Sequence, residues 1–338
     1  MKYSKISLYY ILILLFTCNH GFAQSANELL KKVNLNYDSG YTEQTIALES
    51  KISVLKNVED STAAELYSYL ADAFLVNYNL EKAKIYLERE LSYRKQLQPM
   101  LQKAYSDNLY NLVYVLLELG ENSAARQRMA QLLSADTELY GNESEEYLSS
   151  FSWFIDILVQ DNDLSLALKE INKTIKDIPE TDYYHAVLLS KRGDIQMLLG
   201  NYSDAELDLV KAAGLFQTID SPLDAILTEG LLGLVYVNKG QFPQAEEIFL
   251  NTENKLQELA TPEADMALDD LYNNLAFVYM ALARYQDAIE LYENILERDS
   301  ENYGIMHPNY LSSMVNQGTA YYDMRNFEQA ESVFESAF

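Results

Sequence analysis

The sequence predicts an all-α protein, an α-solenoid built from antiparallel helix hairpins. Three observations support this fold class. Alanines recur at positions 83, 125, 167, 205, 245, 288 and 330, at spacings of 38 to 43 residues. A small or aliphatic residue lies twelve positions before each alanine, namely Ala71, Val113, Ile155, Gly193, Gly233, Ala276 and Gly318. Apolar residues recur at helical spacing around both positions, and a period of this length is typical of stacked helical repeats.

Residues 274–297 show the pattern within one repeat. Leu275, Val278 and Leu282 share one helical face, and Ala288, Leu291 and Ile295 share another. The segment between them, ARYQD, is long enough only for a tight turn, which predicts an antiparallel hairpin. Other repeats carry Gly120, Gly200 or Gly240 at this joint, where a left-handed helix cap favours glycine.

The small residues at the two marked positions predict close helix crossings, because they allow helix axes to approach to ~8 Å rather than ~10 Å. Aromatic residues follow in the second helix of several repeats, among them Phe249, Tyr292 and Phe334. We expect these rings to fill the space between neighbouring hairpins.

Composition limits the classes of partner. The chain has 338 residues, 49% of them hydrophobic, and a formal net charge of −26. This charge argues against a nucleic-acid backbone or an anionic membrane surface as the general partner. Cys18 is the sole cysteine, so the sequence predicts no disulfide framework.

Residues 1–23 have the pattern of a signal peptide. Lys2 and Lys5 precede an apolar run over 6–16 that is too short to span a bilayer, and Gly21-Phe22-Ala23 supplies small residues before Gln24. We therefore expect cleavage after Ala23, export to the periplasm or the extracellular space, and no membrane insertion of the mature chain. The alternative is a lipid anchor through Cys18, although Phe16 and Thr17 are bulky for a lipidation motif.

The residues that carry the repeat resemble the tetratricopeptide repeat family. The period of about 42 residues, rather than the usual 34, and the His307-Pro308 pair are similar to the kinesin-light-chain-like variety found in bacterial exported proteins, including those with CHAT protease domains. The resemblance implies a superhelix. The expected domains are a signal peptide (1–23), a degenerate helical cap (24–63) and seven repeats (64–105, 106–147, 148–185, 186–225, 226–268, 269–310 and an incomplete 311–338).

The resemblance also implies a ligand surface. Family members bind peptides along the concave face formed by the first helix of each hairpin, and the corresponding positions here are Asp72, Tyr110, Tyr114, Asp156, Asp194, Asn273, Phe277 and Met280. Chaperone-binding members use Lys and Asn to hold a terminal carboxylate, but no basic residue stands at these positions. We expect a basic or apolar protein segment instead, anchored by the aromatic residues.

The sequence predicts no enzyme. Of three histidines, His20 lies in the predicted signal peptide, and no phosphate-binding glycine loop, metal-ligand spacing or cofactor motif is present. Trp153 belongs to an apolar run and is expected in the core. The predicted function is an exported protein-interaction scaffold. Two alternatives are the sensor arm of a longer effector, such as a CHAT protease or a sensor kinase, and a nutrient-binding surface lipoprotein.

Overall fold

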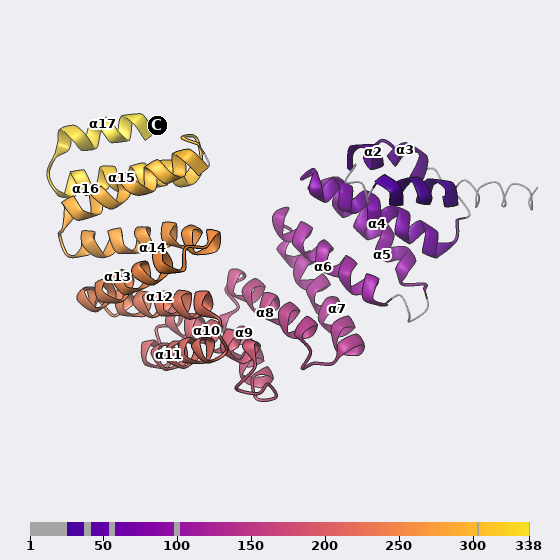
Figure 1. The fold of residues 1–338 in the computed structure, drawn as a ribbon, viewed down its shortest axis with the longest axis horizontal. Coiled ribbons are helices and arrows are strands. Elements are labelled where there is room, and N and C mark those ends of the chain that lie inside the picture. The colour runs from indigo at the N-terminus through magenta and orange to yellow at the C-terminus, as the bar shows by residue number, and fades with distance from the viewer. Residues whose placement is uncertain (1–25, 37–41, 54–57, 98–101, 303, 338) are drawn as a thin grey trace, which may run out of the picture. The chain divides into compact units, whose positions relative to one another are not determined.

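The computed structural model describes residues 26–36, 42–53, 58–97, 102–302 and 304–337, and the predicted signal peptide and its cleavage site lie outside them. Within the described ranges all regular structure is α-helical, with the helices in tandem (Figure 1). This confirms the predicted α-solenoid class. The chain divides after Asp161 into two units, each with its own core, and the division falls inside the predicted repeat 148–185.

Unit 1 begins with a helix over residues 26–36. It continues with α2 (Thr42–Ile46), α3 (Glu49–Ile52), α4 (Asp60–Val76), α5 (Leu80–Arg94), α6 (Gln102–Glu118), α7 (Asn122–Tyr140) and α8 (Glu145–Gln160). From α4 onwards each helix packs on the next. We call α4, α6 and α8 the first helices, and α5 and α7 the second helices.

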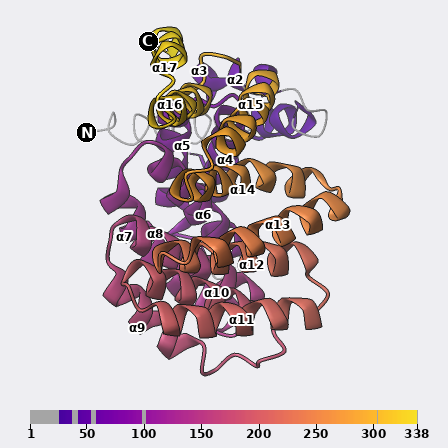
Figure 2. The same cartoon turned by 90° about the vertical axis from the view of Figure 1, so that its left-hand side faces the viewer.

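Unit 2 contains α9 (Leu164–Thr174), α10 (Tyr183–Leu198), α11 (Tyr202–Thr218), α12 (Pro222–Asn238), α13 (Phe242–Leu259), α14 (Pro262–Ala281), α15 (Tyr285–Asn302), α16 (Pro308–Asp323) and α17 (Phe327–Ala337). Here α10, α12, α14 and α16 are the first helices. Successive helices from α10 to α17 pack together, as Figure 2 shows. Pro222, Pro262 and Pro308 each begin a first helix, where the missing N–H costs no hydrogen bond.

The joints between first and second helices share one backbone conformation. Five residues before each marked alanine, the backbone has a positive φ, at Gly120, Gly200 and Gly240 as predicted but also at Tyr78, Asn162, Ala283 and Arg325. Around Ala283, its N–H donates to the Met280 carbonyl and the next N–H donates to the Tyr279 carbonyl. This is the Schellman pattern, which satisfies the last carbonyls of the first helix.

The crossing positions are buried in every hairpin. All seven marked alanines are at most 2% exposed, and the seven residues twelve positions earlier are buried as well. A Cβ atom built on Gly233 would lie 2.3 Å from Cε1 of Phe249, and one on Gly318 would lie 2.6 Å from Cε1 of Phe334. Each ring packs against the glycine of its own hairpin. Phe249 also belongs to the buried unit 2 core with Leu268 and Leu271 of the next hairpin, in line with the expectation that such rings fill the space between hairpins.

A buried Asp–Ser contact joins successive hairpins at two places. The Ser150 hydroxyl at α8 donates to Oδ2 of Asp136 on α7 at 2.7 Å, and both residues are buried. Asp299 on α15 and Ser313 on α16 stand fourteen residues apart like the first pair and are both buried; burial raises the pKa of the Asp299 carboxyl, and its interaction with Ser313 opposes this rise. This contact gives a physical reason for the Tyr-Leu-Ser-Ser sequence that recurs at 147–150 and 310–313.

Candidate functional site

The predicted ligand-binding residues all lie on first helices. Asp72 is on α4, Tyr110 and Tyr114 are on α6, and Asp156 is on α8, so these four belong to unit 1. Asp194 is on α10, and Asn273, Phe277 and Met280 are on α14, so these four belong to unit 2. The candidate site is therefore two sets of side chains, one in each unit.

The unit 1 set has an aromatic centre. Tyr110 and Tyr114 are 48% and 39% exposed, although most other aromatic side chains of α4 to α8 are buried or half-buried. The Tyr110 ring lies 4.8 Å from the ring of Trp153 on α8, measured between centroids. Trp153 is half-buried and packs on the unit 1 core with part of its surface. Sequence reasoning placed Trp153 in the core because its neighbours are apolar, and so it missed the contact with Tyr110.

Asp72 is a half-buried carboxylate beside a buried ion pair. Arg94 Nε donates to Oε1 of Glu90, and Asn108 Nδ2 donates to Oε2 of Glu90 at 2.8 Å. Burial raises the pKa of the Asp72 carboxyl to about 6, while the nearby Arg94 guanidinium opposes this shift. Burial also raises the pKa of Glu90. Asp72 therefore lies between the core and the surface. Asp156 on α8 is half-buried as well.

The unit 2 set is more apolar. Phe277 is 53% exposed, and Met280 lies half-buried one turn further along α14. The Asn273 side-chain amide donates to the Asp269 carbonyl at 3.0 Å, which leaves its oxygen for other contacts. Two exposed apolar residues on neighbouring first helices were not predicted: Leu227 on α12 and Tyr322 on α16. Asp194 on α10 is half-buried.

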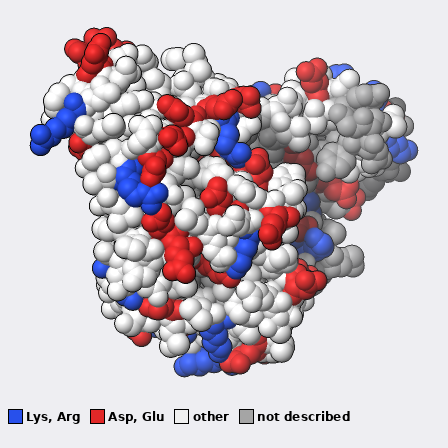
Figure 3. All heavy atoms as spheres, turned by 60° about the vertical axis from the view of Figure 1, so that its left-hand side comes forward, with Lys and Arg blue, Asp and Glu red and all other residues white. Residues whose placement is uncertain are grey.

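Charged side chains are scattered over the surface of the molecule. Figure 3 shows carboxylates spread over the face that it draws, with Lys and Arg interspersed among them. Several cations pair with carboxylates: Lys239 with Glu206 and Arg284 with Glu246 of the preceding hairpin, and Arg298 with Asp269 of its own hairpin. These ion pairs hold the cations at the helix joints and second helices, so they do not supply a basic clamp at the predicted positions.

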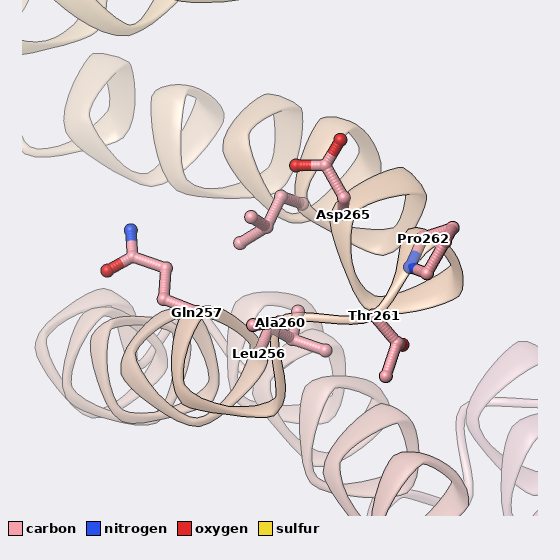
Figure 4. Close-up of a pocket in the computed structure, with 7 residues that line it drawn as sticks. Leu256, Gln257, Ala260, Thr261, Pro262 and Asp265 are labelled. Atoms are coloured by element: carbon pink, nitrogen blue, oxygen red, sulfur yellow. The ribbon is translucent and has the colours of Figure 1, made fainter.

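One open hollow of about 440 Å³ lies at the turn between α13 and α14. Figure 4 shows its lining by Leu256, Gln257, Ala260, Thr261, Pro262 and Asp265. Ala260 takes the left-handed conformation, and Thr261 caps α14 by accepting from the N–H of Ala264 at 3.2 Å. Asp265 already pairs with Arg298. The hollow is therefore a consequence of the chain reversal.

We found no catalytic arrangement in the part of the chain that the structure describes. Nδ1 of the buried His185 lies 2.9 Å from the Ile178 carbonyl, and His307 caps α16 by accepting from the N–H of Asn309 at 3.3 Å. In the described ranges, no three His, Cys, Asp or Glu side chains are grouped closely enough to hold a metal ion. No helix among the described residues is both long and apolar enough to cross a membrane.

Comparison with known proteins matches residues 268–338 to the tetratricopeptide repeat model. Kinesin light chain-related protein 2 of Arabidopsis thaliana is 26% identical over 234 residues, which cover 65% of this chain and 35% of the relative. The chain thus spans about a third of the length of that curated relative.

Two solved structures share the fold. A tetratricopeptide repeat protein from Parabacteroides merdae has a TM-score of 0.55 and 18% identity, over 81% of this chain and 91% of that one. The apo form of the quorum sensor NprR from B. thuringiensis has a TM-score of 0.63 and 15% identity, over 94% of this chain and 86% of that one. At these identities the likeness concerns the fold alone.

Proposed function

Because the chain belongs to the tetratricopeptide repeat family, in its kinesin-light-chain-like form, we propose that it is a scaffold that binds a protein or peptide segment on its first helices. The observation that supports this proposal most directly is the exposure of Tyr110, Tyr114 and Phe277 on these helices. Exposed aromatic side chains are the residues that most often anchor a partner, because they bury a large area at a low cost in side-chain entropy. The segment that fits them is apolar or basic, since the chain carries a net charge of −26.

The test measures partner recovery by variants in a pull-down with the full chain as bait. We expect Tyr114→Ala and Phe277→Ala each to weaken binding of the recovered partner roughly 30-fold, as for an anchor residue worth about 2 kcal/mol. Leu207→Ala is the matched control, because Leu207 is 70% exposed but lies on the second helix α11. Circular dichroism should show unchanged helix content in all three variants. If all three variants lose affinity for the partner equally, or if none does, the first helices are not the binding surface.

We further propose that the chain is exported and that its mature form begins at Gln24. The basic, apolar and small-residue pattern of residues 1–23 supports this proposal. Intact-mass analysis of the soluble and membrane fractions of the source cells tests it. A mass that corresponds to residues 24 onwards without lipid is expected, and an acylated Cys18 would establish the anchored form instead.

A further inference from the structure

The ring pair Tyr110–Trp153 joins two first helices of unit 1, α6 and α8. The two ring centroids lie 4.8 Å apart with an interplanar angle of 50°, and Tyr110 remains 48% exposed beside Trp153. Tyr114 follows Tyr110 by four residues on α6, and Asp156 follows Trp153 by three on α8. Residues at these spacings are neighbours on a helix surface, so two further side chains flank the ring pair.

The chain itself uses cations to cover other aromatic rings. The Arg284 guanidinium lies 4.2 Å from the Tyr279 ring centroid, Lys239 Nζ lies 4.9 Å from that of Tyr236, and Arg89 lies 5.3 Å from that of Tyr86. No Lys or Arg within the described ranges lies over Tyr110, Tyr114 or Trp153 in this way. The electron-rich faces of these rings therefore remain available to a cation from another molecule.

The charges around the ring pair favour the same ligand. The exposed stripe of α6 places Asp107 before Tyr110 and Glu118 after Tyr114. Asp107 accepts from Lys103 at 2.9 Å, and Glu118 accepts from the Tyr78 hydroxyl, which is not a cation, at 2.7 Å. A cation that approaches the rings therefore meets an acidic surface. The net charge of −26 makes a second copy of this chain an unfavourable source of that cation.

We propose that Tyr110 and Trp153, flanked by Tyr114 and Asp156, form a subsite for an arginine side chain of the partner segment. The guanidinium is favoured over an ammonium group because it is planar, stacks on aromatic rings and is more weakly hydrated. This inference rests on the proposed scaffold function and specifies the chemistry that unit 1 recognises.

Trp153 is the only tryptophan of the chain, so its fluorescence reports this subsite without labelling. The experiment titrates the full chain, in 150 mM salt, with three acetylated and amidated Gly/Ser decapeptides. The three peptides differ only in their central residue, which is arginine, lysine or citrulline. Citrulline has nearly the shape of arginine but carries no charge. We expect a saturable change in Trp153 emission, with the arginine peptide binding roughly five- to twentyfold more tightly than the citrulline peptide and more tightly than the lysine peptide.

Variants assign the signal to the rings. Tyr110→Leu should bring the arginine and citrulline affinities to within about twofold, and Tyr110→Phe should keep most of the difference. Phe327→Leu, at an exposed aromatic residue of the second helix α17 in unit 2, should leave the difference unchanged. Equal affinity for arginine and lysine, unaffected by Tyr110→Leu, would mean diffuse attraction to an acidic protein and would overturn the proposal. So would a signal that Tyr110→Phe abolishes. If pull-down recovery still depends on Tyr114 and Phe277, the scaffold function stands without the arginine subsite.

Discussion

Gly233 shows how the helix crossings constrain single residues. The space that its Cβ would need is filled by the ring of Phe249, sixteen residues later on the paired helix. The same spacing relates Gly193 to Leu209 and Gly318 to Phe334. Side-chain volume is therefore complementary within a hairpin, since a glycine on the first helix faces a large residue on the second.

A matched pair of substitutions on α12 tests this interpretation. Gly230 lies on the same helix, but its Cβ would meet only Thr252 Cγ2, at 3.8 Å. Both Gly→Ala changes gain helix propensity, so Gly230→Ala should stabilise by about 0.5–1 kcal/mol. Gly233→Ala should instead destabilise by about 1–3 kcal/mol through overpacking. Urea unfolding measures both. Phe249→Leu in the Gly233→Ala background should recover part of the loss, and equal effects of the two glycine substitutions would refute the crossing geometry.

Asp72 gives a prediction about pH. Its folded pKa, about 6, lies above the ordinary value of 3.8, so the folded protein holds this proton more tightly than the unfolded chain does. Stability contributed by the protonated group is thus lost as pH rises from about 4 through 6. Asp72→Asn should raise the free energy of unfolding by about 2 kcal/mol at pH 7.5 and by less than about half as much at pH 4.5. Asp107→Asn, a change of the same type at an exposed position on α6, is the control. The same gain at both pH values would contradict the assignment.

At the scale of the element, each joint needs one residue in the left-handed conformation, and the sequence reveals this only in part. Gly120, Gly200 and Gly240 were predicted because glycine adopts it without steric cost. Tyr78, Ala283 and Arg325 adopt it too, although nothing in their chemistry indicates it. Here the packing of the two helices on either side determines the backbone, at a cost of about 1–2 kcal/mol for a residue with a Cβ.

We therefore predict opposite effects on stability for two substitutions at the joints. Ala283→Gly should stabilise by up to about 1 kcal/mol, because relief of the left-handed strain exceeds the entropy that glycine adds to the unfolded chain. Gly240→Ala should destabilise by about 1 kcal/mol, and no atom lies within 4 Å of the added methyl group to complicate the result. Thermal unfolding of the two variants measures both effects. If both substitutions shift Tm in the same direction, the backbone of the two joints is not equivalent.

The candidate site shows the same division between what sequence could and could not predict. The resemblance to tetratricopeptide repeats placed Tyr110, Tyr114 and Phe277 on first helices, where all three side chains are exposed. It could not predict that Trp153 meets Tyr110, since that contact joins helices of different hairpins. Nor could it predict the half-buried state of Asp72, which depends on α5 and α6 packing beside it.

At the scale of the whole molecule, the repeat period suggested one continuous array, but the described chain divides into two compact units. The unit 1 core runs from Leu29 to Ile157, and the main unit 2 core runs from Ile226 to Ala320. The repeat period does not reveal this division, because Ile155 and Ala167 keep the usual twelve-residue spacing across it. Stability in such arrays is a sum of local terms, so a change in one core should act mainly on its own unit.

Reciprocal core substitutions test the independence of the two units. Leu112→Ala in unit 1 and Phe249→Ala in unit 2 each remove a fully buried side chain, at a cost of about 2–5 kcal/mol. Hydrogen exchange measured by mass spectrometry should then rise in α4 to α8 for the first variant and in α12 to α15 for the second, with the other unit unchanged. Trp153 fluorescence follows unit 1 alone, whereas circular dichroism at 222 nm follows both units. The urea transitions reported by fluorescence and by circular dichroism should therefore separate in either variant, because each substitution weakens only one unit. Coincident transitions, together with lost protection in both units, would show that the two cores unfold as one.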